Sequence, residues 1–167
     1  MNEIIKKRRS IRQYDKSKPI SKEQLNTMLS AAMMAPSACN TRPWEFIAVR
    51  DRDILDRIAE EHPHAKMCGT ATAAIIVVAV PQTGIAEGYY PQDCGAATQN
   101  ILLAAAEMGL GTCWCGVYPK TERMKEIASL FDIKEPLLPF CIIAIGYPDE
   151  NPEQRGFFEG GKVRYID

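Results

Sequence analysis

Two long runs of apolar residues constrain the fold of this chain more than any other feature. Residues 73–80 have the sequence AAIIVVAV, and residues 139–146 have the sequence PFCIIAIG. Neither run alternates with polar residues, and both contain several β-branched side chains, which is typical of strands buried on both faces. Because each face of such strands needs an apolar cover, we expect a central sheet with helices on both sides.

Helical periodicity supplies the expected cover. Ser21-Lys22-Glu23-Gln24 has the pattern of a capping box, and the helix after it is expected to stop at Pro36. Further helices are predicted around the apolar stripe of residues 54–59, ending near Pro63, over residues 92–108 and from a cap at Thr121. Shorter strands are predicted over residues 44–49 and 112–117. The helix over 92–108 is apolar almost all round, so it is either central or covered by a partner subunit.

These elements fit one α+β domain over residues 1–167, and the composition excludes several classes of function. Lys and Arg number 20 against 21 Asp and Glu, a net charge of −1, so no overall positive field exists to hold nucleic acid. No apolar run approaches the roughly 20 residues that span a membrane, and no apolar signal segment follows the N-terminus. We therefore expect a cytoplasmic protein with no nucleic-acid or membrane partner.

The side chains that usually bind metals form no recognisable set. The six cysteines contain no Cys-x-x-Cys pair, so we interpret them as reduced structural thiols. The only histidines, His62 and His64, flank Pro63 at a helix end and are expected in an exposed turn. Phosphate-loop, nucleophile-elbow and Rossmann signatures are also missing. We expect no metal and no catalytic side chain, so any chemistry would belong to a bound cofactor.

A cluster of positive charge at residues 8–12 indicates an anionic ligand. Arg8, Arg9 and Arg12 surround Ser10 in a chain whose total charge is close to zero. Guanidinium groups bind phosphate oxygens bidentately, and packing such charges together is repulsive unless an anion neutralises them. The cluster therefore predicts a phosphate-bearing ligand, and the alternative interpretation is a solvated basic turn.

Four segments of the chain, which are weakly specific one by one, indicate a protein family when they are taken together. They are Arg8-Arg9-Ser10-Ile11-Arg12, Pro36-Ser37-Ala38-Cys39-Asn40-Thr41-Arg42-Pro43-Trp44, Gly109-Leu110-Gly111-Thr112-Cys113-Trp114-Cys115-Gly116 and Lys162-Val163-Arg164. Together they resemble the nitroreductase family of FMN-dependent oxidoreductases, in the family's order and over nearly the whole chain. The resemblance implies a central, mainly antiparallel sheet flanked by helices. It also implies a homodimer that holds FMN in two equivalent sites at the subunit interface.

Carried over by position, the resemblance implies a set of cofactor-binding residues. Arg8, Ser10 and Arg164 would bind the FMN phosphate, with Arg9 along the phosphate and ribityl side. Arg12 and Lys162 would lie near the pyrimidine edge, where a cation stabilises the reduced flavin. The remaining members are a loop from the opposite subunit, with Pro36, Ser37, Ala38 and Asn40, and a strand end whose backbone approaches the ring, with Trp114, Cys115 and Gly116. The alternatives are core packing for Trp114 and a disordered end for the C-terminal tail.

The implied activity is ping-pong hydride transfer, in which NADH or NADPH reduces the flavin and a nitroaromatic or quinone acceptor then takes its place. Two alternatives stay open: a flavin-binding or redox-sensing protein without significant turnover, and a reductive dehalogenase-like flavoenzyme. The segment 82–91 is short for the specialised lid of the latter, and leaves Tyr89 and Tyr90 as candidates to line the pocket. Many members contact the flavin pyrimidine just before the central buried strand, and the sequence at residues 62–66 assigns no residue to that contact.

Overall fold

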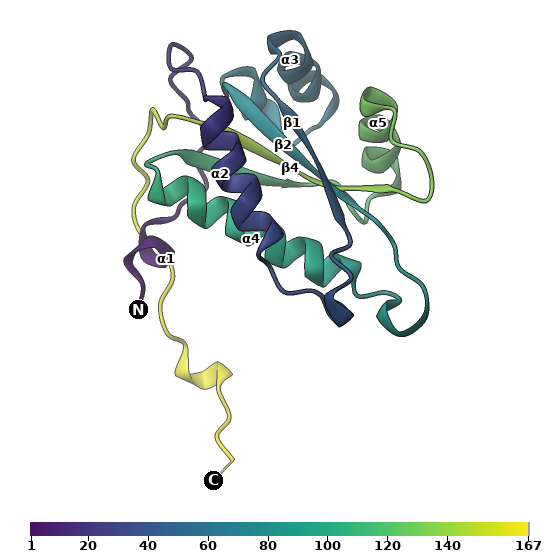
Figure 1. Cartoon of the computed structure of the whole chain (residues 1–167). Helices are drawn as coiled ribbons and strands as arrows, with labels where there is room; N and C mark the ends of the chain where they lie inside the picture. The colour runs from purple at the N-terminus through teal and green to yellow at the C-terminus, as the bar shows by residue number, and fades with distance from the viewer. Residues whose placement is uncertain (167) are drawn as a thin grey trace.

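The computed structural model describes residues 1–166 and has an antiparallel sheet at its centre (Figure 1). The sheet has four strands in the order β1 (Trp44–Val49), β2 (Ala73–Ala79), β4 (Leu138–Gly146) and β3 (Gly111–Gly116). The two apolar runs of the sequence form the two inner strands, which pair from Ala73↔Ile145 to Ala79↔Leu138. Every residue of β2 is buried. The prediction that these runs are interior strands is therefore confirmed.

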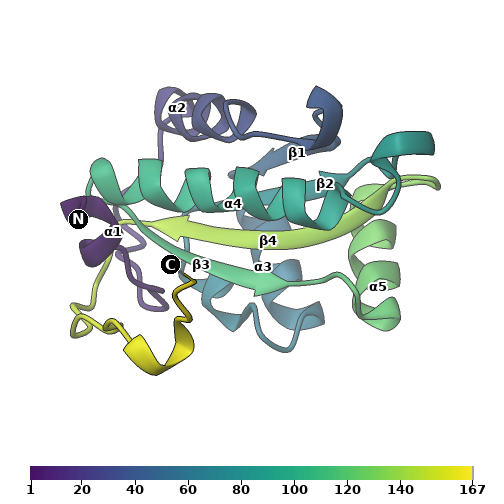
Figure 2. The ribbon, with the colours of Figure 1, turned by 90° about the horizontal axis from the view of Figure 1, so that it is seen from below.

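Helices cover both faces of the sheet, as Figures 1 and 2 show from two directions. One face carries α2 (Lys22–Met33) and α4 (Tyr90–Glu107), and the other carries α3 (Arg52–Glu61) and α5 (Thr121–Phe131). Alternate residues of β2 enter two different apolar clusters, with Ile75 on the α2 and α4 side and Ile76 on the α3 and α5 side. Both faces of β2 are apolar for this reason, and the predicted α+β class is confirmed.

The long helix α4 lies between α2 and the sheet. Its buried residues include Ala97, Ile101 and Ala105. None of the large apolar side chains that are exposed in residues 1–166 belongs to α4. It begins at Tyr90, two residues before the predicted start, because Pro91 is accommodated in the first turn, where a helix needs no backbone donor. The predicted cap of α5 at Thr121 is wrong, since Lys120 holds the cap position and Thr121 is the first helical residue.

The N-terminal segment packs against the outer strand β3. After the short α1 (Glu3–Lys7), Ser10 forms a parallel bridge with Thr112, and the backbone N–H of Ile11 donates to the Thr112 carbonyl at 2.9 Å. Gly111 permits this approach, since a Cβ built on it would lie 2.8 Å from the Ile11 Cβ. The arginine cluster is thereby fixed beside the edge of the sheet.

The C-terminal segment behaves differently along its length. Near the sheet it is held in place, with the Asp149 N–H donating to the Gln13 carbonyl at 2.9 Å. Farther on it runs away from the body as an exposed, irregular segment with one helical turn, Gly160–Lys162 (Figure 1). Among residues 1–166, no helix has both the length and the apolar character needed to cross a membrane.

Candidate flavin site at the edge of β3

A cavity of about 470 Å³ opens at the outer edge of the sheet. Its floor and walls come from three segments of the chain, represented by Arg12, by Pro63, His64, Lys66 and Met67, and by Cys113, Trp114, Cys115 and Gly116. Because β3 is the outer strand, those backbone groups on its free side that the N-terminal segment leaves unpaired are available to a ligand. Its volume lies in the range of small-molecule sites. We call it the ring cavity, because the family resemblance implies that a flavin ring would lie at this end of β3.

A second, smaller cavity of about 170 Å³ lies along the same N-terminal segment. Its lining residues, within the part of the chain that the structure describes, include Lys7, Arg8, Arg9 and Thr112, with Glu150 as the one acidic residue among them. The Arg9 Nε is buried and has no hydrogen-bond partner within the described chain. Across residues 1–166, no carboxylate lies within ion-pair distance of Arg8, Arg9 or Arg12. Concentrated positive charge with an unused buried donor fits a phosphate group, so we call this the phosphate cavity.

The end of β3 offers an open surface next to buried thiols. A Cβ built on Gly116 would meet no atom within 4 Å, which leaves space for a planar group to approach the backbone. Trp114 packs against Phe140 with ring centroids 6.1 Å apart and keeps 38% of its surface exposed, so core packing accounts for only part of its surroundings.

The thiols beside this surface differ in their ionisation. The neighbouring Cys115 side chain and, after it, the charge of Arg12 lower the pKa of Cys113 to about 7. Interaction with Cys113, together with burial, raises the pKa of Cys115 well above its usual range. Cys115 is therefore a neutral thiol at physiological pH, in keeping with a role for its backbone and not its sulfur.

The loop over residues 36–40 lies at the other end of α4 from the arginine cluster (Figures 1 and 2). Both carboxylate oxygens of Asp93, in the first turn of α4, accept from the Ala38 N–H at 3.2 Å. Cys39 and Asn40 have positive φ angles of 51° and 55°, as does Arg42 at 51°. Left-handed conformations at several non-glycine residues are costly, and they concentrate where a loop binds something.

The predicted residues thus fall into two groups in this chain. The structure brings to the ring and phosphate cavities Arg8, Arg9, Arg12, Trp114, Cys115 and Gly116. Ser10 lines neither cavity, but its bridge to Thr112 places it next to the phosphate cavity. It does not bring to either cavity Pro36, Ser37, Ala38, Asn40, Lys162 or Arg164. Lys162 is exposed and pairs with Glu159 at 2.7 Å, and Arg164 is exposed two residues farther along the tail.

Comparisons with known proteins decide the family. The family model described as the nitroreductase family matches residues 5–67 and 61–147. The chain belongs to the nitroreductase family. A protein of Methanothermobacter thermautotrophicus, provisionally named NADH dehydrogenase/NAD(P)H nitroreductase, is 45% identical over 161 residues, which is 96% of this chain and 84% of the relative. The resemblance noted in the sequence is confirmed, and it supports an NAD(P)H-dependent oxidoreductase.

Two solved structures place the fold in the same family. The FMN-dependent nitroreductase of Clostridium difficile R20291 superposes with a TM-score of 0.90 at 31% identity, covering 100% of this chain and 99% of that one. A nitroreductase of Desulfovibrio desulfuricans, solved in complex with FMN, has a TM-score of 0.82 at 28% identity and covers 99% and 95% of the two chains. The nitroreductase fold, with its antiparallel sheet and flanking helices, is therefore confirmed.

Sequence reasoning missed two parts of this candidate site. Glu150 accepts hydrogen bonds through Oε1 from the backbone N–H groups of Arg12 and Gln13, so it fixes the end of the arginine cluster. His64, Lys66 and Met67 form the wall that the sequence left unassigned. Only the position of Lys66 before the buried strand gave any signal for it, whereas Glu150 is 138 residues from Arg12 and carried none.

One expectation about the histidines is wrong. His64 is exposed as predicted, but His62 is fully buried at the C-terminal cap of α3. Its Nε2 lies 3.1 Å from the Gly116 carbonyl, and its Nδ1 accepts from the His64 N–H at 3.2 Å. Burial lowers the pKa of His62, because the charged imidazolium loses its hydration. The flanking Pro63 suggested a surface turn, but the end of β3 packs against the His62 side chain and buries it.

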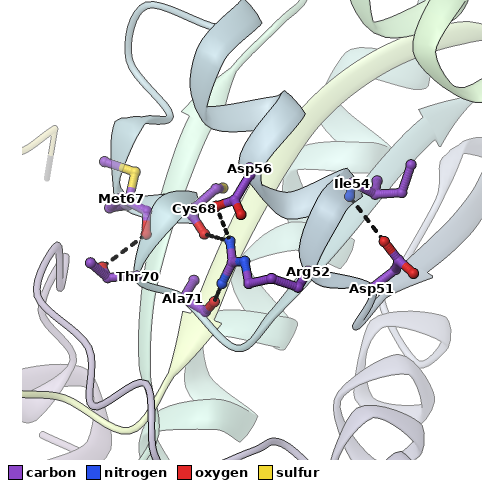
Figure 3. Close-up of polar contacts among 8 residues, drawn as sticks. All are labelled: Asp51, Arg52, Ile54, Asp56, Met67, Cys68, Thr70 and Ala71. Atoms are coloured by element: carbon purple, nitrogen blue, oxygen red, sulfur yellow. Dashed lines mark hydrogen bonds and ion pairs between the residues drawn. The ribbon is translucent and has the colours of Figure 1, made fainter.

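The turn Lys66–Gly69, which carries Lys66 and Met67, is anchored to α3 on its far side (Figure 3). The Arg52 guanidinium donates to the carbonyls of Cys68 at 2.7 Å and Ala71 at 2.8 Å, and it pairs with Asp56 at 2.9 Å. The planar fork of an arginine can hold two carbonyls at once, which a lysine cannot do. The wall of the ring cavity is therefore a fixed structure and not a loose loop.

Tyr89 and Tyr90 have separate surroundings. Tyr90 packs edge-on against Tyr118 with ring centroids 5.7 Å apart, and Tyr89 is half exposed at the start of α4. Neither side chain lines the ring cavity of the same chain.

Proposed function

We propose that this chain is an FMN-dependent oxidoreductase that carries a hydride from NADH or NADPH to a nitroaromatic or quinone acceptor. The observation that carries the proposal is a set of guanidiniums without carboxylate partners, fixed along the phosphate cavity and continuing into the ring cavity. Two related structures, one named FMN-dependent and one solved with FMN, support the same cofactor.

The residues present fit FMN by their chemistry. Arg8 and Ser10, with Arg9 beside them, would bind the phosphate dianion through guanidinium and hydroxyl donors. Arg12 would face the pyrimidine edge from the rim of the ring cavity, with Lys66 as a second cation on the opposite wall. When bound there, FMN supplies the chemistry of accepting and donating a hydride.

The protein's own task is to bind and orient. The open space in front of Gly116 permits a flat ring to lie against the end of β3. Cys115 keeps its proton at neutral pH and transfers none, so protons needed by the acceptor would come from water at the open cavity. The positive charge of Arg12 and Lys66 would favour the reduced state of the cofactor.

We further propose that the working unit is a homodimer. In one chain, the loop 36–40 and the arginine cluster lie at opposite ends of α4, a helix of 18 residues or about 27 Å. A second copy that packs along α4 in the opposite direction would carry its own loop 36–40 to the ring cavity. It would also supply Lys162 and Arg164 from its exposed tail. A groove between α1 and α4, lined by Ile4, Ile5 and Leu103, offers apolar surface for such packing.

The test is a titration of the purified protein with FMN, followed by reduction without oxygen. We expect the bound flavin to lose its yellow absorption on addition of NADH or NADPH and to regain it with a quinone. Chromatography with light scattering should give twice the chain mass.

Failure at different steps has different meanings. A protein that takes up no FMN contradicts the proposal as a whole. One that binds FMN but is reduced by neither nucleotide is a flavin-binding protein without turnover, and the oxidoreductase assignment is then wrong.

A further inference from the structure

His62 connects the two walls of the ring cavity without lining it. The imidazole is fully buried, with its Nε2 3.1 Å from the Gly116 carbonyl at the end of β3. On the other side of the ring, Nδ1 lies 3.2 Å from the backbone nitrogen of His64. Gly116 belongs to one wall of the cavity and His64 to the other, so one side chain spans both.

The hydrogen bonds settle which nitrogen of His62 carries the proton. The His64 N–H is a donor, so Nδ1 must be the acceptor and must be unprotonated. The proton of the neutral ring is then on Nε2, which donates to the Gly116 carbonyl. A second proton on Nδ1 would point toward the His64 N–H, and two donors cannot form a hydrogen bond. His62 therefore bonds to both Gly116 and His64, an arrangement we call the His62 bridge, only in the neutral form with the proton on Nε2.

The Gly116 carbonyl is held from two directions. Besides His62, the Arg123 guanidinium of α5 donates to it at 3.2 Å. The Arg123 hydrogen bond is exposed, whereas the His62 bond is partly buried and its imidazole is fully buried, so the His62 bond is the better shielded from water. The charged and titratable groups that face the imidazole are Arg123 and Glu126 of α5 and His64 in its own turn. From β3, the Gly116 carbonyl contacts it.

We propose that His62 is a positioning residue for the flavin: it sets the spacing between the end of β3 and the wall formed by His64, Lys66 and Met67. The proposal rests on the proposed FMN function, because a ring of fixed thickness is what this spacing would select. Arg52 holds the same wall from its far side, so His62 is needed only where the wall meets β3. No hydride or proton passes through the imidazole.

The experiment compares three substitutions in the full-length protein. His62→Leu keeps much of the volume and removes both hydrogen bonds, whereas His62→Asn keeps an acceptor near Nδ1 but does not reach Gly116. His62→Gln places an amide donor near the position of Nε2. We expect Leu and Asn to weaken FMN binding by about tenfold, the loss typical of one removed hydrogen bond, and Gln to restore it to within about threefold. The absorption spectrum of the bound flavin should shift in Leu and Asn and return in Gln.

Ile101→Val is the matched control for lost stability, since it removes one buried methyl group from α4 on the opposite face of the sheet. It should lower the melting temperature without changing FMN affinity or the flavin spectrum. A His62→Leu protein that folds and binds FMN with unchanged affinity and spectrum overturns the proposal. So does a Gln variant no better than Leu.

One measurement is independent of the flavin and of any variant. Nitrogen chemical shifts of the His62 ring in the wild-type protein without FMN should show an unprotonated Nδ1 and a protonated Nε2. The opposite tautomer overturns the bridge even if FMN binds. If the tautomer is as expected but the protein takes up no FMN, the bridge stands and the proposed function is what fails.

Discussion

The two basic segments of this nitroreductase have similar side chains and opposite surroundings. Residues 8–12 are fixed to β3 by the Ser10↔Thr112 bridge, by the Ile11 backbone bond and by Glu150. Residues 162–164 lie on an exposed tail, where the Lys162–Glu159 ion pair is local. The first segment is ordered before any ligand arrives, whereas the second must lose conformational entropy on binding. Equal charge therefore does not mean equal contribution to affinity.

The largest expected effect comes from moving the ordered segment away from β3. Gly111→Ala places a methyl group 2.8 Å from the Ile11 Cβ, so the segment must shift. We expect a loss of about 1–3 kcal/mol in the free energy of unfolding and at least about tenfold weaker FMN binding. Urea unfolding and a flavin titration measure the two quantities.

Gly116→Ala is the control for Gly111→Ala, because its added methyl group meets nothing within 4 Å. Its stability should stay within about 0.5 kcal/mol of wild type, while FMN binding weakens if the ring approaches this backbone. Equal stability losses in the two variants would show that the close approach at Gly111 does not hold the segment.

Removing one arginine from each segment compares them directly. Arg8→Ala is expected to weaken FMN binding by up to about a hundredfold, since a charged hydrogen bond from an ordered donor is lost. Arg164→Ala should weaken FMN binding by only about tenfold. The entropy cost of ordering the tail already cancels part of what the Arg164 hydrogen bond contributes to affinity. Calorimetric titration gives both affinities and their entropies. An Arg164→Ala protein with unchanged affinity removes the tail from the site.

A smaller effect is expected from the anchor behind the arginines. The Tyr14 hydroxyl donates to the Ile11 carbonyl at 2.6 Å and lies 3.3 Å from the Ala144 carbonyl, and burial raises its pKa, so it stays protonated. Tyr14→Phe should lower the free energy of unfolding by about 1 kcal/mol. Faster amide exchange at Ile11, with an unchanged exchange rate at residues 162–164, would show that the loss of stability arises in the ordered segment. Unchanged exchange at Ile11 contradicts it.

Acid should affect the ordered part of the site and leave the tail alone. The pKa of His62 is lowered mainly by burial, so in mildly acidic solution the unfolded chain binds a proton that the folded chain does not. The contribution of His62 to stability is complete above the ordinary imidazole pKa and declines as the pH falls below it. Subtracting the pH profile of His62→Gln isolates this term, and identical profiles would contradict it.

Local sequence patterns predicted most of the fold because each depends on neighbours a few residues away. The apolar runs over 73–80 and 139–146 identified the inner strands, and Ser21 with Gln24 identified a capping box that the structure contains. His62 was misplaced because its burial comes from β3, more than fifty residues later in the chain. No local pattern reports such a partner.

The candidate site divides in the same way. The sequence by itself determined which chemical groups are available, since arginines and a hydroxyl within five residues favour an anionic ligand such as a phosphate. Only the tertiary structure decided where that chemistry lies. Gly111 and Glu150 fix the cluster at the open edge of β3, and the length of α4 separates it from the loop 36–40. The physical reason is that charge and hydrogen-bonding capacity belong to single residues, whereas distance and burial belong to the packed chain.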